Sequence, residues 1–264
     1  MKKIAAFFLA IAVIVLLSIS SCDNKKDETS AQKITLEVAA AHVKFAAAGI
    51  GNITIDWGDE TKPEIAVLSS VMSNFSHQYL SGEKHTIEIA GHVTSFYSGH
   101  FEIDGSYATN EIITLDASKN SVLKTLDCSE NIITQMDVSK CSALIELHCW
   151  SNQLTTLNLN DNTALQKLRC MQNKLTSLVV SNNNMLTMII CSENKITKLD
   201  MSNNIKLKEL YCDKNNLLHT ELNKLFETLH DKNIAGKTVL VSGNLGSKYC
   251  DTAIASKKGW KIYN

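Results

Sequence analysis

Five cysteines recur at a fixed interval of 21 residues, and this period constrains the fold more than any other feature. The column consists of Cys128, Cys149, Cys170, Cys191 and Cys212. Leucine or isoleucine stands two and five residues before each cysteine, and asparagine stands three residues after it. Self-similarity at such a period indicates a stacked repeat, in which each unit buries its apolar face against the next.

A second short strand is nested about half a period after each cysteine, with the pattern of Leu115-Asp116-Ala117. The whole unit, L-x-x-L-x-C-x-x-N-x-[IL], resembles the 21-residue bacterial subclass of leucine-rich repeat, as in internalin-like proteins. The resemblance implies a mainly β solenoid over residues 105–218, with two parallel ladders of strands and coils about 4.8 Å apart. We call these the cysteine ladder and the nested ladder.

The cysteine column admits a disulfide framework, a metal site, a catalytic centre or a packing role. Because side chains alternate along a strand, the leucine and the cysteine of L-x-C both point inward. Sulfurs stacked at the coil spacing are too far apart for a bond of about 2.05 Å, and a single file does not surround zinc. Buried cysteine behaves as a small hydrophobe. We therefore predict that the column is core, and that the asparagines bond backbone groups at the turns.

Residues 33–98 show short alternating runs bounded by turn residues, and HVKFAA and NITIDWG are predicted as two separate strands among them. This pattern predicts a β-sandwich. The segments IDWGDE and FSHQYLSGEKHTIEI resemble the polycystic-kidney-disease (PKD) type domain. The matching positions are Trp57, Gly58, Asp59, His77, Tyr79 and Gly82. Asp56, Asp59 and Glu60 admit a calcium site, but calcium takes six to eight oxygens and this is one tight turn. We expect Asp59 to cap the turn and His77 to be structural.

The first 21 residues predict a secretory signal, because Lys2 and Lys3 precede an apolar run too short to span a membrane. Ile19-Ser20-Ser21-Cys22 resembles a bacterial lipobox, which implies lipidation of Cys22; ordinary secretion is the alternative. Residues 22–32 read as a flexible tether. Its Lys26-Asp27-Glu28 run resembles the export signals of surface lipoproteins, or is a solvated linker. We expect a lipid-anchored outer-membrane protein, exposed at the cell surface.

Residues 219–264 depart from the period and predict a capping region of two helices and two strands. The run Gly243-Asn244-Leu245-Gly246, together with Trp260, resembles the C-terminal cap that follows such bacterial repeats.

Function is expected on outward positions. On the nested ladder these are small and polar, whereas the cysteine ladder places large side chains outward, as interfaces do. The candidate ligand-binding face consists of Glu146, His148, Trp150, Arg169, Met171, Met188, Ile190 and Tyr211. The alternative is that another part of the protein, or a second copy, covers this face.

The formal net charge of -1 and a single arginine disfavour nucleic-acid binding. The chain has no nucleophile elbow, P-loop or zinc motif, and Glu146 and Glu209 sit about 14 Å apart, too far for a glycosidase pair. We expect no enzyme activity, no cofactor and no metal. The predicted function is protein binding or adhesion at the cell surface. The alternative is a glycan-binding lipoprotein in which Trp150 and Tyr211 stack on sugars.

Overall fold

The computed structural model describes residues 32–80, 82–103 and 106–264. The predicted signal peptide and the predicted lipidation site, Cys22, lie outside these residues. Within the described part, no helix is both long and apolar enough to cross a membrane.

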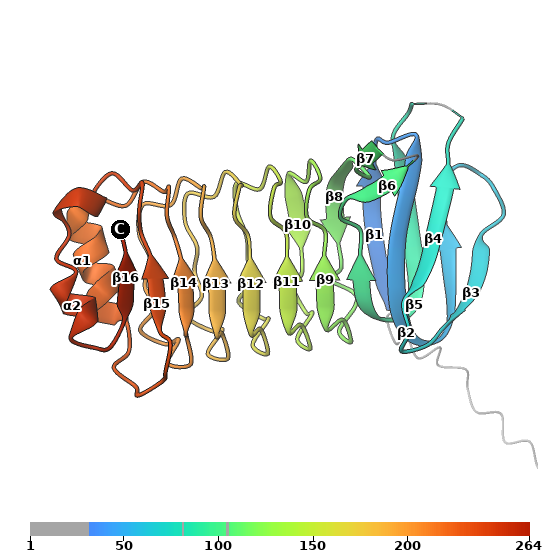
Figure 1. Ribbon diagram of the computed structural model, residues 1–264. Helices are drawn as coiled ribbons and strands as arrows, with labels where there is room; N and C mark the ends of the chain where they lie inside the picture. Colours follow the sequence, from blue (N-terminus) through green and yellow to red (C-terminus); the bar gives the residue numbers. More distant parts are fainter. Residues whose placement is uncertain (1–31, 81, 104–105) are drawn as a thin grey trace, which may run out of the picture. The chain divides into compact units, whose positions relative to one another are not determined.

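The described chain is mainly β (Figure 1). The strands that precede the repeats are β1 (Lys33–Val38), β2 (His42–Asp56), β3 (Glu64–Leu68), β4 (Ser73–Gln78), β5 (His85–Tyr97), β6 (Phe101–Ile103) and β7 (Ser106–Ala108). The strands of the repeats are β8 (Ile112–Asp116), β9 (Thr125–Asp127), β10 (Gln135–Asp137), β11 (Glu146–His148), β12 (Lys167–Arg169), β13 (Met188–Ile190) and β14 (Glu209–Tyr211). The last elements are α1 (His219–Thr228), β15 (Thr238–Leu240), η1 (Ser247–Tyr249), α2 (Ala253–Ser256) and β16 (Lys261–Tyr263).

Two long strands, β2 and β5, each take part in two layers. The sequence predicted separate strands on either side of the glycine-rich AGIGN segment, and this is wrong: β2 runs through it, with register shifts against β5. A Cβ at Gly49 would stand 2.0 Å from His92 O, so only glycine allows the two backbones to approach this closely. Irregularities of this kind bend a strand and let it pass from one layer to the other.

The strand pairings place the halves of β2 and β5 in different surroundings. The first half of β2 pairs with β4 and the end of β5, and its second half pairs with β3 and the start of β5. The start of β5 also pairs with β1. Together these contacts define two layers around a core that contains Phe45, Trp57 and Phe96.

Both layers continue into the repeats. Strand β1 pairs with β8, and β8 with β10, so one layer leads into the nested ladder. The end of β5 pairs in parallel with β9, so the other layer leads into the cysteine ladder. One hydrophobic cluster runs from Ile34 to Trp260. The segments predicted as a sandwich and as a solenoid therefore share a sheet and a core.

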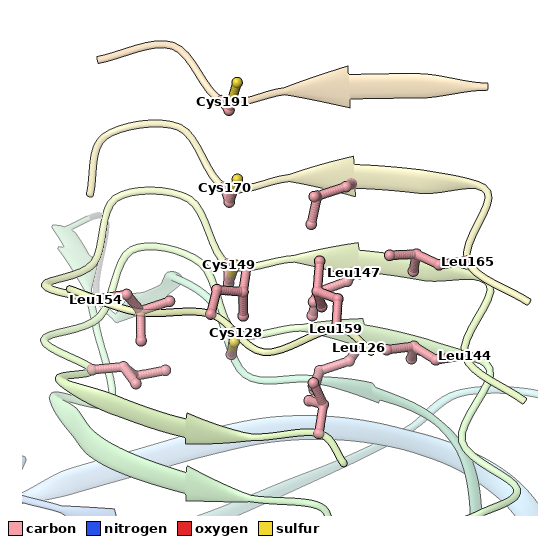
Figure 2. Close-up of a cluster of buried hydrophobic side chains, with 14 of the residues drawn as sticks. Leu126, Cys128, Leu144, Leu147, Cys149, Leu154, Leu159, Leu165, Cys170 and Cys191 are labelled. Carbon is pink, nitrogen blue, oxygen red and sulfur yellow. The ribbon is translucent and has the colours of Figure 1, made fainter. Parts of the chain in front are cut away.

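The cysteine ladder is a continuous parallel sheet in the order β5, β9, β11, β12, β13, β14, β15 and β16. Figure 2 shows the sulfurs of Cys128, Cys149, Cys170 and Cys191 stacked in one column, with Leu126 and Leu147 beside it. All five cysteines of the column are 0% exposed, which confirms that they belong to the core. These parallel coils confirm the stacked 21-residue repeat that the sequence predicted.

The asparagines after the cysteines join neighbouring coils. Asn173 is representative: its Nδ2 donates to the carbonyl of Cys170 in its own coil at 3.2 Å and to that of Cys149 in the preceding coil at 3.0 Å. Its Oδ1 accepts from the Leu154 amide at 2.9 Å. The backbone groups inside the turn are thus satisfied by side chains, as the sequence predicted.

Beyond α1 the ladder continues, although the 21-residue period has ended. Strands β15 and β16 add to the sheet in parallel, with Val239 and Ile262 in register with Leu210. Asn244 takes the place of the next asparagine, since its Nδ2 donates to Cys212 O and its Oδ1 accepts from Leu217 N. The C-terminal segment thus adds two more strands to this face.

Candidate functional site: the outward face of the cysteine ladder

The predicted ligand-binding residues come together on one face because the strand registers align their columns. The pairings place His148, Arg169, Ile190 and Tyr211 in one column across β11 to β14. Glu146 and Met188 lie in the adjacent column, which also contains Lys167 and Glu209. Trp150 and Met171 stand two residues after the last residues of β11 and β12.

These side chains are half-buried rather than fully exposed. This holds for all five large side chains of the face, which are Trp150, Met171, Met188, Ile190 and Tyr211. The physical reason is the strand spacing of about 4.8 Å, at which each large side chain shields its neighbours. The face therefore presents a packed surface to solvent rather than separate protruding groups.

The register extends the face beyond the residues that the sequence indicated. Tyr97 at the end of β5 pairs with Asp127, and Tyr263 of β16 pairs with Leu240, so both belong to the column of His148. They are 41% and 44% exposed. Neither tyrosine was predicted from the sequence, because both lie outside the 21-residue period. The only sequence signal for such a position is a short strand in which one apolar residue stands between two residues that point outward, as in Lys-Ile-Tyr of β16.

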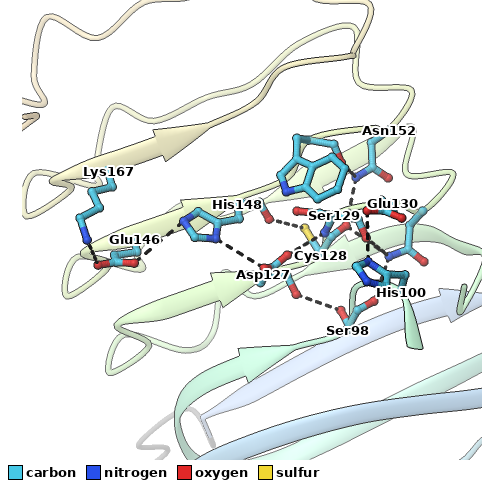
Figure 3. Close-up of polar contacts among 12 residues, drawn as sticks. Ser98, His100, Asp127, Cys128, Ser129, Glu130, Glu146, His148, Asn152 and Lys167 are labelled. Carbon is cyan, nitrogen blue, oxygen red and sulfur yellow. Dashed lines mark hydrogen bonds and ion pairs between the residues drawn. The ribbon is translucent and has the colours of Figure 1, made fainter. Parts of the chain in front are cut away.

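A chain of charged groups crosses the first strands of the face (Figure 3). Lys167 Nζ lies 2.8 Å from Glu146 Oε1, and His148 Nδ1 lies 3.4 Å from Asp127 Oδ2. His148 Nε2 is 3.9 Å from Glu146 Oε2. The backbone of Asp127 also accepts from the Ser98 amide at 2.7 Å, which ties the chain to β5. The charges at this end of the ladder therefore largely satisfy one another.

The Asp127 carboxylate is held ionised by its hydrogen bonds. Burial alone would raise the pKa of Asp127, but hydrogen bonds from the His148 side chain and the Ser129 amide outweigh it, so the pKa lies below its ordinary value. The Ser129 amide donates to Oδ1 at 3.0 Å. Asp127 is therefore a fixed negative charge on the face at neutral pH.

Arg169 differs from the other cations of the face. Across the residues that the structure describes, its guanidinium makes no ion pair and no side-chain hydrogen bond, and its Nε is buried without a partner. Lys167 beside it is paired with Glu146, and Lys214 is paired with Glu193 at 2.9 Å. Arg169 thus carries an uncompensated charge in the middle of a half-buried apolar surface.

A hollow of about 220 Å³ lies where the first strands meet the cysteine ladder, and we call it the junction hollow. Its lining includes Lys44, Tyr97, His100, Asp127 and Trp150. His100 Nδ1 lies 3.1 Å from Glu130 Oε1. Burial, together with the negative charge of Asp127, raises the pKa of Tyr97, so the Tyr97 phenol stays protonated. Of these five residues only Trp150 was predicted, because no sequence spacing links 44, 97 and 100 to the repeat.

The nested ladder is a different surface. Its outward side chains between Thr156 and Ser202 are exposed, and Val179, which is 59% exposed, is its large apolar residue. This agrees with the small, polar character that the sequence indicated. The two ladders of the same solenoid thus differ in their outward side chains, which are small, polar and exposed on the nested ladder and large and half-buried on the cysteine ladder.

The turn at Asp59 is structural, as expected. Asp59 Oδ1 accepts from the Thr61 hydroxyl at 2.6 Å, and Oδ2 lies 2.6 Å from His77 Nε2. His77 stacks on Trp57 with ring centroids 4.9 Å apart, and Tyr79 donates to the Trp57 carbonyl at 2.7 Å. These contacts use the carboxylate within the turn. Among residues 32–264 as described, no group of three or more His, Cys, Asp or Glu is placed to hold a metal.

The buried thiols are poorly suited to nucleophilic chemistry. Burial raises the pKa of Cys170 to about 12, so its thiol stays protonated at neutral pH. The nested Cys141 is similar, because burial followed by the charges of Asp137 and Asp116 raises its pKa to about 12. Its thiol donates to Ala117 O at 3.1 Å instead.

No family model matches the chain, and no curated protein matches it. Among solved structures, the functional domain of InlJ from Listeria monocytogenes, described as including a cysteine ladder, is 36% identical with a TM-score of 0.46, over 54% of this chain and 30% of that one. An internalin, InlF, from Listeria monocytogenes is 22% identical with a TM-score of 0.44, over 56% of this chain and 45% of that one. A leucine-rich-repeat protein of Leptospira interrogans is 20% identical with a TM-score of 0.41, over 56% and 44%. The chain thus spans less than half the length of each.

Proposed function

We propose that this chain is a non-enzymatic protein-binding lipoprotein of the cell surface, and that it binds its partner through the outward face of the cysteine ladder. The observation that carries the proposal is the asymmetry between the two ladders. One face gathers Trp150, Met171, Ile190 and Tyr211 into a half-buried apolar surface, and the other is exposed and polar. Aromatic residues, methionine and arginine are enriched in the buried centres of protein interfaces.

The size of the face also suits a partner protein. Eight parallel strands from β5 to β16 at about 4.8 Å spacing extend over about 34 Å. A standard interface buries about 800 Å² on each side, which a surface of this length accommodates. The rigid ladder pre-organises the side chains, so binding does not have to order them first.

The test is a capture screen against extracellular proteins with two variants of opposite location. Ile190→Glu places a charge on the cysteine ladder, and Val179→Glu places the same charge on the nested ladder, in an adjoining stretch of the chain. We expect Ile190→Glu, alone or with Trp150→Ser, to abolish capture while Val179→Glu captures normally. Circular dichroism of each variant reports on folding. Equal loss or equal retention in the two variants would contradict the proposal.

A glycan-binding function is the second candidate, and the junction hollow favours it. At about 220 Å³ the hollow is smaller than typical drug-sized pockets, and it places Trp150 and Tyr97 near the Asp127 carboxylate. A single sugar ring needs an aromatic face for its C–H groups and an acceptor for its hydroxyls. A glycan array separates the candidates: glycan binding that Tyr97→Ala removes, without loss of protein capture, assigns the hollow to sugar.

The membrane anchor is part of the proposal. The lipobox-like sequence before Cys22 supports cleavage and acylation at that residue, and the polar segment behind it supports a tether to the folded part. Metabolic labelling with a fatty acid should mark the parent protein and leave Cys22→Ala unlabelled. Protease treatment of intact cells then tests surface exposure, since an inward-facing protein would survive it.

The PKD-type identity of residues 33–98 remains a proposal as well. It is supported by the contacts among Trp57, His77 and Tyr79 at the positions where the motif places them. In this molecule the region also supplies β1 and β5 to the ladders, so it closes the N-terminal end of the solenoid. Its role in binding is then to expose Tyr97 and Lys44 beside the face.

A further inference from the structure

Arg169 stands out on the proposed binding face because its charge has no counterion. It is the only arginine of the chain, and within the described residues its guanidinium has neither an ion pair nor a hydrogen bond. The buried Nε is an N–H donor with no acceptor. Leaving a buried donor unsatisfied is costly, more so when the group is charged. A group of this kind is stabilised when a ligand supplies the acceptor.

The surroundings of Arg169 favour an anion that brings apolar groups with it. In register, Arg169 lies between His148 and Ile190, and Met188 and Met171 belong to the flanking columns. These aliphatic side chains are half-buried, so a partner that covers them also lowers the dielectric around the guanidinium and strengthens its interactions.

The carboxylates on the neighbouring strands do not serve this purpose because they have other partners, and Glu209, which is two strands away on β14, forms no ion pair with Arg169 among the described residues. Glu146 lies 2.8 Å from Lys167, and Asp127 accepts from Ser129 and contacts His148. On the other side, Asp213 is hydrogen-bonded to Ser192. Strands β11 to β13 therefore present two cations, Lys167 and Arg169, but only one carboxylate. That carboxylate is Glu146, which is paired with Lys167.

We infer that Arg169 receives an aspartate or glutamate side chain of the polypeptide partner, in an extended segment whose neighbouring apolar residues cover Met171, Met188 and Ile190. This inference rests on the proposed protein-binding function. The planar guanidinium pairs with a carboxylate through two parallel hydrogen bonds, which a lysine does not reproduce. Methionines adapt to the shape of the apolar residues beside it. In an extended segment, residues two positions from the acid share its face.

The uniqueness of Arg169 makes the test direct. Protein labelled with ¹⁵N-arginine gives one Nε–Hε cross peak in a ¹H–¹⁵N spectrum, and it reports this side chain alone. The probes are two blocked peptides, acetyl-Val-Ser-Glu-Ser-Val-amide and the same peptide with glutamine in place of glutamate. We expect the glutamate peptide to shift the peak and to bind at least about tenfold more tightly, since a charge-assisted hydrogen bond is lost in the other.

Three further arms make the outcome decisive. Acetate reports a carboxylate without apolar neighbours and should shift the peak at higher concentration than the glutamate peptide. Glucuronate reports a sugar carboxylate; if it acts at lower concentration than the peptide, the assignment to a polypeptide is overturned. If both peptides act equally, or neither moves the peak, the carboxylate assignment is overturned.

Variants separate this inference from the function on which it rests. With a partner from the capture screen, Arg169→Gln should weaken binding at least about tenfold, and Arg169→Lys should recover only part of the loss. If Ile190→Glu abolishes capture but Arg169→Gln does not change it, the inference fails and the binding face stands. If Ile190→Glu has no effect either, the proposed function itself fails.

Discussion

The two sides of the solenoid are built from one repeat, yet they differ in how neighbouring coils are joined. On the cysteine side, every coil adds a strand to a parallel sheet that continues to β16. On the nested side, the described residues form only two strands, β8 and β10. These two strands pair with each other, and β8 also pairs with β1. Further along, a hollow of about 240 Å³ lies between nested segments at Leu157 and Val179.

The two asparagine columns explain part of this difference. On the cysteine side, Oδ1 of Asn173 accepts the Leu154 amide, and each cysteine carbonyl receives asparagines of two coils. On the nested side, the turn closes through its own backbone, with the Asn183 amide donating to Val180 O. Oδ1 of Asn183 is then left buried without a partner. Asparagine thus bonds neighbouring coils through both Nδ2 and Oδ1 on the cysteine side, and through Nδ2 alone on the nested side.

This difference bears on the binding function that we propose for the cysteine ladder. A ladder in which coils are joined by strands and fully bonded asparagines holds its outward side chains in fixed register, which a binding surface requires. The nested side, with fewer bonds between coils, carries small polar groups that need no such precision. The large outward residues therefore lie on the side where the most hydrogen bonds join neighbouring coils.

The strongest contrast should come from placing asparagine at one cysteine of each ladder. At Cys170, whose thiol makes no hydrogen bond among the described residues and is fully buried, Cys170→Asn should destabilise by about 4 kcal/mol, from an unsatisfied amide and overpacking. At Cys141, which occupies an asparagine position of the nested ladder, Cys141→Asn should cost less than about 1 kcal/mol. Urea denaturation measures both. Equal costs would show that the two columns are not distinct.

A smaller contrast is expected when the asparagines are removed. Asn173→Ala should cost about 3 kcal/mol, because several hydrogen bonds are lost and the Leu154 amide is orphaned. Asn183→Ala should cost about half as much, because Leu159 O and Asn162 O each keep a backbone donor. The measurement is again the denaturation midpoint, with hydrogen exchange at Leu154 as the local reporter. Faster exchange there in Asn183→Ala than in Asn173→Ala would refute the explanation.

The smallest contrast concerns acid stability. The pKa of Asp127 is lowered, because hydrogen bonds from His148 and Ser129 outweigh burial, and that of Asp200 is lowered chiefly by its backbone hydrogen bond with Ser202. A lowered carboxyl pKa contributes stability above the unfolded value of about 3.9, and the contribution is lost as pH falls through the folded value. Asp127→Asn should therefore flatten the acid limb of the stability profile more than Asp200→Asn, since Asp200 has no histidine partner. The reverse order would show that His148 does not stabilise the ionised Asp127.

Much of the architecture was predictable because the repeat is local and periodic. Each 21-residue unit must bury its own leucines and cysteine against identical neighbours, so burial of Cys170 and bonding by Asn173 follow from position alone. The columns of the candidate face were predictable for the same reason, since alternation along L-x-C decides which residues point outward. Periodicity also predicted the helix that begins near His219.

Contacts without periodicity were decided only in three dimensions. The bend of β2 at Gly49, the pairing of Tyr97 with Asp127 and the addition of β16 depend on segments that share no spacing with the repeat. The junction hollow and the missing counterion of Arg169 depend on where particular side chains end. A repeating sequence pattern specifies the contacts between one coil and the next. What meets the first and last coils, and which charge finds a partner, depends on long-range packing that no local pattern encodes.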